Sequence, residues 1–201
     1  LLRYLPPDTS EPWQPIDPVV LAWLKGRPET ALVVPKFENK PAEGGSPEPI
    51  SIQSIDAPKT GLWFSISGAL GVYPSLEAQV TKMDTIVTEG RFLKDEDLNG
   101  ILISGEAAKE LQVGVNDTVN FFGQAYNVTG IFDSGKLEGL RDLDGESLVP
   151  WYVQKITSPG APPSYKSMHV SGSEVVIFHA ETAKRFSSFP IIIQMMISRI
   201  D

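Results

Sequence analysis

The 201-residue chain is 41% hydrophobic, which is enough to bury a core as one domain or as two small ones. Its 17 Lys and Arg residues against 25 Asp and Glu residues give a net charge of -8, which argues against a nucleic-acid partner because phosphate backbones are repelled. The chain contains no cysteine, and this excludes disulfides, thiolate nucleophiles and cysteine-based zinc sites.

The first elements predicted are a helix and two strands. Residues 17–26 favour a short helix, with an Asp N-cap, proline at the first helical position and glycine just beyond the end. Trp23 is expected on the apolar face of this helix, packed in the core. Residues 31–38 and 50–55 read as strands that could pair as neighbours. Residues 60–79 have no clean period, so we expect an irregular stretch with one strand.

The middle of the chain has the clearest pattern. A strand beginning at residue 85 leads through an acidic turn into the apolar strand 101–103. Ser104 is a good N-cap for a helix over residues 106–112, which Gly114 is well placed to end. Two further strands, 118–122 and 125–132, read as a hairpin. We therefore expect residues 85–132 to form a compact strand-helix-hairpin unit.

The last third of the chain predicts strands and a short helix around a loop. A strand is expected to start near residue 148, and residues 158–163 form a proline-rich loop by composition. A strand at 174–178, a short helix at 181–186 and a strand at 191–200 follow. No apolar run approaches the roughly 20 residues of a spanning helix, so any membrane anchor is expected outside these residues.

One segment comes close to a catalytic signature. Residues 130–137 match a phosphate-binding loop except at Leu137, where Ser or Thr should hold the magnesium ion. Asp133 would also place a negative charge among the amides that cradle phosphate, and the residues after it do not begin a convincing helix. We therefore expect no nucleotide binding.

Other polar candidates have structural interpretations. His169 and His179 are the only histidines, and we expect them to cap or pack rather than to bind a metal. The acidic segment 142–146 resembles half a calcium loop but lacks the ligand spacing, so a turn is expected there. The sequence predicts no catalytic, cofactor-binding or metal site.

Aromatic side chains are the best candidates for a partner-binding surface, because Trp and Tyr are enriched in interface hot spots. The aromatics that read as exposed are Trp13, Trp23, Trp63, Phe64, Tyr73 and Trp151. Trp63 and Phe64 lie in the stretch without a period and are the predicted partner-binding residues.

Residues 89–132 follow a distinctive order of turns and elements. A Gly90-Arg91-Phe92 turn with trailing acids precedes an apolar strand, a helix that starts with small residues, an Asn116-Asp117 turn and a hairpin closing on Val128-Thr129-Gly130-Ile131. This order resembles the MacB-like periplasmic core domain of the MacB/FtsX-like ABC-transporter permeases. In that family a glycine usually stands where Asn116 is found.

The resemblance implies an α+β fold in which a βαβ-containing porter-like subdomain joins a mostly β second subdomain with a short helix. We expect residues 1–80 and 165–201 to form the porter-like part and residues 81–164 to form the inserted strand-helix-hairpin part. The parent protein would lie in the cell membrane, with this domain periplasmic or extracellular between the first and second transmembrane helices. ATP hydrolysis is implied on a cytoplasmic ATPase subunit or domain, and the domain itself is not expected to be an enzyme.

The leading hypothesis is that the domain couples ATP-driven permease movement to export or to a periplasmic or extracellular partner, which is a protein or an exported cargo. The alternative is a free-standing secreted or surface binding module without catalytic activity. A third hypothesis is an enzyme whose site is assembled from scattered carboxylates. The isolated domain is expected to be mainly monomeric, because membrane helices and the ATPase supply most of the assembly and the charge of -8 opposes self-association.

Overall fold

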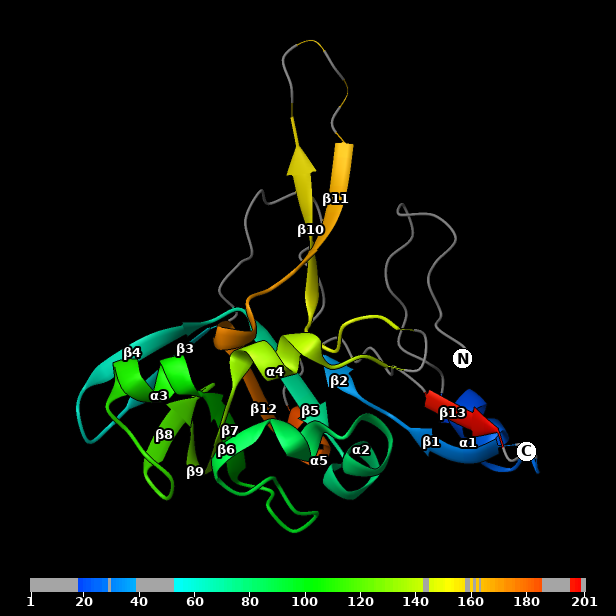
Figure 1. Cartoon of the computed structure of the whole chain (residues 1–201), viewed down its shortest axis with the longest axis horizontal. Helices are drawn as coiled ribbons and strands as arrows, with labels where there is room; N and C mark the ends of the chain where they lie inside the picture. The colour runs from blue at the N-terminus through cyan, green and yellow to red at the C-terminus, as the bar shows by residue number, and fades with distance from the viewer. Residues whose placement is uncertain are drawn as a thin grey trace.

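The computed structural model describes residues 18–28, 30–38, 53–142, 145–157, 160, 162, 164–185 and 196–199. These residues form a mixed α+β fold in which short helices surround a large sheet (Figure 1). The expected fold class is therefore confirmed. Among the described residues, every helix is too short or too polar to span a bilayer.

A nine-stranded mixed sheet forms the body, with the strand order β2-β5-β12-β7-β9-β8-β3-β4 and with β6 also paired to β9. Strands β5 and β12 are parallel neighbours, as are β7 and β9, and the other pairs are antiparallel. The strands of this sheet are β2 (Phe37–Glu38), β3 (Gln53–Ala57), β4 (Leu62–Ile66), β5 (Gly68–Val72), β6 (Val87–Gly90), β7 (Gly100–Ser104), β8 (Thr118–Phe121), β9 (Gln124–Phe132) and β12 (Val175–His179).

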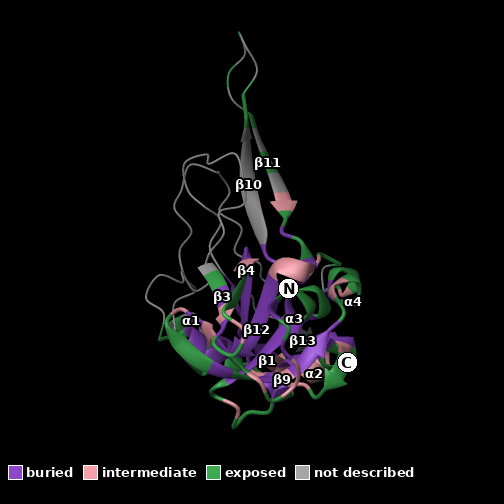
Figure 2. Cartoon of the chain, turned by 90° about the vertical axis from the view of Figure 1, so that its left-hand side faces the viewer, coloured by how far each residue is buried: buried purple, intermediate pink, exposed green. Residues whose placement is uncertain are grey.

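The sheet separates two apolar clusters, because successive side chains of a strand point to opposite faces. Ile101 and Ile103 of β7 belong to one cluster, and Leu102 between them belongs to the other. Helix α3 packs on the first face, whereas α4 and η1 supply residues to the second. Figure 2 shows the sheet as the buried centre of the molecule. The helices are α1 (Pro18–Lys25), α2 (Pro74–Thr81), η1 (Met83–Ile86), α3 (Gly105–Leu111), α4 (Ser134–Gly139), η2 (Gly172–Glu174) and α5 (Ala180–Ala183).

Two small sheets extend the body. Strand β1 (Thr30–Val34) pairs antiparallel with β13 (Met196–Arg199), beside α1 at one end of the molecule (Figure 1). Strands β10 (Trp151–Ile156) and β11 (Ser164–His169) form a hairpin that projects from the body in both views (Figures 1 and 2). The sequence predicted only the start of this hairpin, because β11 is too polar to read as a strand.

The strand-helix-hairpin unit is confirmed for β7, α3 and the β8–β9 hairpin, whereas the first predicted strand begins at Val87 and not at Thr85, because Met83–Ile86 form η1. The Ser104 side chain accepts a hydrogen bond of 3.1 Å from the Ala107 N–H and caps α3. Phe122 and Gly123 both have positive φ, at 51° and 71°, as a two-residue hairpin turn of type I′ requires. Gly90 also has positive φ, and a Cβ there would lie 2.5 Å from the Thr129 carbonyl oxygen.

Several sequence predictions need correction. Residues 60–79 are regular, because they contain β4, β5 and most of α2. Helix α3 ends at Leu111 and is capped by Gln112 with φ of 55°, so Gly114 does not end it. The predicted strand 31–38 is split at Pro35, which has no N–H to donate. Strand β2 pairs with β5, and β3 pairs with β4 and β8, so the predicted pairing of these two regions is wrong.

In the last third of the chain, the structure agrees in part with the elements predicted from the sequence. The predicted strand 174–178 corresponds to β12, and the short helix to α5, which is four residues long. Of the predicted strand 191–200, residues 196–199 form β13, and residues 191–195 and 200 lie outside the described residues. The division into residues 1–80 with 165–201 and residues 81–164 stays a prediction.

Candidate partner-binding surface

The two predicted partner-binding residues lie on opposite faces of β4, the last strand in the sheet order. The Trp63 side chain is 67% exposed. Phe64 is half-buried and packs against the apolar cluster beneath α3. Trp63 is therefore positioned to contact a partner, whereas Phe64 serves mainly the core. Their role in binding stays a prediction.

The face around Trp63 carries polar side chains of the neighbouring strands. Trp63 pairs with Asp56 across the β3–β4 hairpin, and Asp56 pairs with Asn120 of β8. The Asn120 side-chain amide donates a hydrogen bond of 2.9 Å to the Asp56 carboxylate, which holds both groups in place. This part of the surface can stack a ring on Trp63 and offer hydrogen bonds beside it.

The turn between β3 and β4 fixes where Trp63 lies. The Gly61 N–H donates a hydrogen bond of 2.8 Å to the Ala57 carbonyl, and Gly61 has a φ of +70° that suits glycine. The Thr60 hydroxyl donates to the Leu111 carbonyl at 2.9 Å. This bond ties the hairpin to the end of α3.

A polar cluster lies where the parallel strands β5 and β12 end. The Tyr73 hydroxyl donates a hydrogen bond of 2.6 Å to Glu181 Oε1, and Lys184 Nζ lies 2.6 Å from the same oxygen. The His179 ring caps α5 by accepting the Glu181 N–H at 3.1 Å. The histidine therefore has the capping role that the sequence predicted.

The hydrogen bonds of this cluster set its electrostatics. The bond from Lys184, followed by that from Tyr73, lowers the pKa of the Glu181 carboxyl. Burial, followed by the bond to Glu181, raises the pKa of the Tyr73 hydroxyl. A carboxylate that accepts bonds from two donors is a poor base, so the role of this cluster is structural: it holds α5 against the end of β5.

A buried ion pair connects the segment between β1 and β2 to α2. Lys36 Nζ lies 3.0 Å from Glu77 Oε1, and the two side chains are 2% and 0% exposed. The Thr81 hydroxyl donates a hydrogen bond of 2.9 Å to the same Glu77 oxygen. Within the described part of the chain, Glu77 Oε2 has no hydrogen-bond donor. This pair was not predicted from the sequence, although Lys36 inside the apolar run 31–38 was a usable signal.

Arg91 anchors the loop before β7. Its guanidinium Nη2 donates a hydrogen bond of 3.0 Å to Asp97 Oδ1, and Nη1 donates to the Phe92 carbonyl. The bond from Arg91 also lowers the pKa of the Asp97 carboxyl. This acidic turn is therefore a folded loop in which the arginine stabilises one acid.

The segment that resembled a phosphate-binding loop has a different structure. Its first residues belong to strand β9, and Asp133 caps α4 by accepting the Lys136 N–H at 2.9 Å. Leu137 is fully buried in the core. The expectation of no helix here was wrong, because Asp133 is the N-cap of α4, whereas the sequence prediction considered it only as a charge that would repel phosphate. A six-residue helix capped by a carboxylate does not offer its amides to phosphate.

The remaining candidates have structural roles. His169 Nδ1 lies 2.7 Å from the Val149 carbonyl oxygen at the base of the hairpin. Asp142 Oδ1 accepts the Glu146 N–H at 3.1 Å, which forms the predicted turn. Across the described residues there is no group of three or more acidic or histidine side chains that could hold a metal ion. Trp13 and the Trp151 side chain lie outside the described part.

Trp23 differs from its prediction. Its side chain is 56% exposed, and the Arg27 guanidinium lies 4.9 Å from the ring centre. Among the residues of α1 whose burial is described, Leu24 is the buried one, at 4% exposure. The buried residue of this helix is therefore Leu24 and not its neighbour Trp23. Trp23 and Arg27 are four positions apart, and this spacing was a signal for an exposed pair.

No protein-family model and no curated protein sequence matches the chain. Solved structures are similar to it, and two of them are described here. The extracellular domain of the noncanonic ABC-type transporter YknZ from Gram-positive bacteria has 15% identity and a TM-score of 0.50, over 90% of this chain and 71% of that one. The periplasmic region of MacB from Actinobacillus actinomycetemcomitans has 10% identity and a TM-score of 0.49, over 90% of this chain and 63% of that one. The chain therefore has the fold of the extracellular domain of an ABC-type transporter, which is the MacB/FtsX-like fold that the resemblance implies.

Proposed function

We propose that this chain is the extracytoplasmic domain of an ABC-transporter permease and couples ATP-driven movement of the membrane part to export or to an extracytoplasmic partner. The observation that carries the proposal is the antiparallel pairing of β1 with β13, in which Thr30 lies opposite Arg199. A domain inserted between two transmembrane helices must receive and return the chain at one place. The pairing provides this arrangement.

The same arrangement can transmit force. Strand β1 continues through Lys36 into β2, which pairs with β5 inside the nine-stranded sheet. The buried ion pair between Lys36 and Glu77 fixes this connection to α2. A packed interior is stiff, so a displacement of the paired ends would move the sheet and its projecting hairpin as a unit.

The partners follow from this proposal. A cytoplasmic ATPase subunit or domain would act through the transmembrane part, and the free side of the domain would contact a protein or a cargo. The leading contact residue is the exposed Trp63 of β4, a strand that lies at the end of the sheet away from β1 and β13 (Figure 1). The proposal assigns no catalytic step to the domain.

The first test is the gene sequence on both sides of the chain together with the location of the domain. Apolar helices of about 20 residues on both sides would support the permease. A signal peptide and a stop codon would support a free-standing binding module instead.

Location can be tested with a single cysteine, because the chain has none of its own. Trp63→Cys, placed in the parent protein with any other cysteines replaced, should react with a membrane-impermeant maleimide in intact cells. Leu137→Cys, at a fully buried position, is the matched control and should stay unlabelled. Labelling of Trp63→Cys only after lysis would contradict the proposal.

A further inference from the structure

The second face of the nine-stranded sheet changes from apolar to polar along the sheet. At the end formed by β5, β12 and β7, Leu70, Ile177 and Leu102 are buried in the apolar cluster that η1 and α4 complete. At the opposite end, six residues of β3, β4, β8 and β9 lie on this face, because their neighbours along each strand belong to the cluster on the other face. These six exposed or half-buried residues are Asp56, Trp63, Thr118, Asn120, Ala125 and Asn127.

Four of these residues form a row across the sheet. Trp63 of β4 pairs with Asp56 of β3, and Asp56 pairs with Asn120 of β8. Asn120 in turn pairs with Ala125 of β9. The row covers three gaps between strands of about 4.8 Å each, or about 14 Å in all, which is longer than one sugar ring. An extended ligand that crosses the strands can therefore contact the whole row.

The row places an aromatic ring beside hydrogen-bonding groups that are held in position. The Trp63 side chain is 67% exposed, so its ring is open to a ligand. The Asn120 amide donates a hydrogen bond of 2.9 Å to Asp56 Oδ2. That bond uses one of two amide hydrogens and one of two carboxylate oxygens, so both residues keep further capacity to donate or accept.

This combination fits an uncharged sugar chain better than other polymers. A pyranose with equatorial hydroxyls has apolar C–H groups on the faces of its ring, which stack on an indole, and hydroxyls at its rim, which both donate and accept. The Asp56 carboxylate and the net charge of -8 repel nucleic acids and acidic polysaccharides. A protein interface has an apolar core and buries about 800 Å² on each partner, whereas Trp63 is the one large apolar residue of the six.

We propose that Trp63, Asp56 and Asn120 bind an extended, uncharged, β-linked polysaccharide outside the cell membrane. One sugar stacks on Trp63, and hydroxyls of the next sugar bind Asp56 and Asn120. This proposal rests on the proposed function for the location of the domain, and it names a polysaccharide as the extracytoplasmic partner. The bound polymer would contact the end of the sheet away from β1 and β13, so movement of the domain would act against it (Figure 1).

The test is calorimetric titration of the purified chain with two uncharged hexasaccharides, cellohexaose and chitohexaose. Saturable binding of at least one of them is expected. Hexagalacturonate has a similar length and one carboxylate on each sugar, and it should bind at least about fivefold more weakly than the better uncharged ligand.

Three variants test the named residues. Trp63→Ala should weaken binding at least about fivefold, because it removes the stacking surface. Asn120→Ala should weaken it about threefold or more through lost hydrogen bonds. Asp56→Asn keeps an oxygen that can accept the Asn120 bond but has no charge, so it should reduce the preference against hexagalacturonate.

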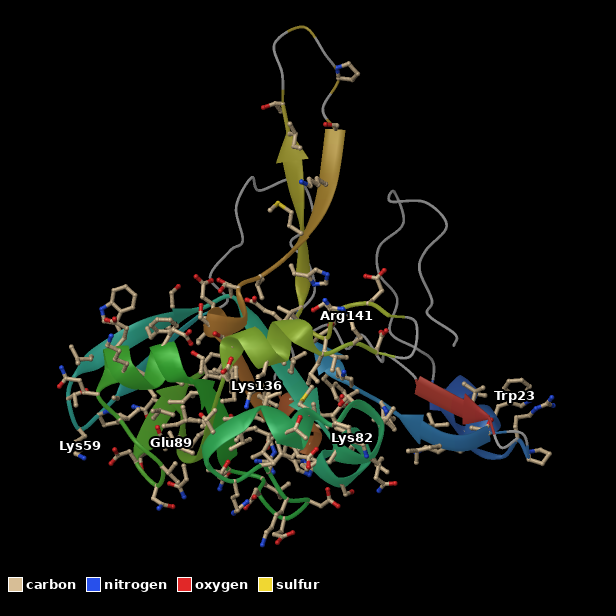
Figure 3. The ribbon with its side chains drawn as sticks, in the orientation of Figure 1. Trp23, Lys59, Lys82, Glu89, Lys136 and Arg141 are labelled. Atoms are coloured by element: carbon tan, nitrogen blue, oxygen red, sulfur yellow. The ribbon has the colours of Figure 1, made fainter. Side chains whose placement is uncertain are left out.

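Trp23→Ala is the matched control, because Trp23 is also an exposed tryptophan, at 56%, and should not affect binding. Figure 3 shows Trp23 at the opposite end of the molecule from Lys59, which lies in the turn between β3 and β4. Urea unfolding of each variant checks that the fold is retained. If Asn120→Ala unfolds, Trp63→Ala and Asp56→Asn still test the site.

Three results would overturn the proposal: no binding of either uncharged hexasaccharide, equal binding by Trp63→Ala and the wild type, or tighter binding of hexagalacturonate. A protein that cross-links to Thr118→Cys in cells, without any binding of the hexasaccharides, would assign the face to a protein and also overturn it. These outcomes would leave the permease function intact, because the flanking sequence and the maleimide labelling do not depend on sugar binding.

Discussion

Replacing Lys36 with Met removes one half of the buried ion pair and leaves the Glu77 carboxylate in the core with only Thr81 as a donor. Both side chains are almost fully buried, so solvent does not screen the lost partner. Loss of one member of such a pair costs about 3 to 5 kcal/mol. That is a large share of the roughly 5 to 15 kcal/mol by which domains are stable, and it corresponds to a fall in Tm of roughly 10 °C.

The double variant separates pairing from packing. In Lys36→Met with Glu77→Leu, both charges are gone, and the Thr81 hydroxyl keeps its bond to the residue 77 carbonyl at 3.0 Å. Such replacements are often neutral or stabilising, so this variant should lie close to the wild type. The milder Glu77→Gln variant completes the comparison if Lys36→Met unfolds.

The assay is urea unfolding followed by circular dichroism, evaluated as a double-mutant cycle. We expect a coupling energy of about 3 kcal/mol or more between the two positions. Additive effects, with a coupling energy below about 0.5 kcal/mol, would show that the two charges are not energetically paired.

Three smaller effects and the association state are also predicted. Ser104→Ala should cost about 1 kcal/mol in urea unfolding, because it removes the N-cap of α3. Gly90→Ala should lower Tm clearly, since its Cβ would lie 2.5 Å from a carbonyl oxygen of β9 at a φ of +74°; an unchanged Tm would contradict this. The lowered pKa of Glu181 stabilises the fold at any pH above the ordinary carboxyl pKa of 4.5, and this stabilisation is lost as pH falls through the folded pKa. The unfolding free energies of wild type and Glu181→Gln should therefore converge in acid. The difference at neutral pH should stay below about 1 kcal/mol, because the side chains of Glu181 and Lys184 are partly exposed. In sedimentation the chain should behave as a 22.0 kDa monomer, and a dimer that persists at nanomolar concentration and is lost in Trp63→Ser would move the partner surface to β4.

Local signals in the sequence predicted local structure well. The Ser104 cap and the β8–β9 hairpin were predictable because each depends on residues a few positions apart. Strand β5 was not predictable from alternation, because it is buried on both faces and all five residues are apolar or glycine. Its parallel neighbour β12 is more than 100 positions away, and no short-range pattern reports such a pairing.

The candidate surface was only half predictable for the same reason. The aromatic pair at 63–64 marked the right strand, and alternation along β4 then decided that Trp63 is exposed and Phe64 is not. The Tyr73 and Glu181 contact joins residues 108 positions apart, so it is visible only in the fold. Trp23 shows that a helix of eight residues has too few turns for its buried side to be assigned from apolarity alone.

In the proposed function, ATP-driven movement of a membrane part is transmitted to this domain. The most direct measurement places one fluorophore at Lys166→Cys, an exposed position on the projecting hairpin, in the parent protein reconstituted with its ATPase and with acceptor dye in the lipid. Energy transfer to the lipid should change when ATP is added, and the change should be absent with an ATPase unable to bind ATP. Energy transfer that stays the same in every nucleotide state would contradict it.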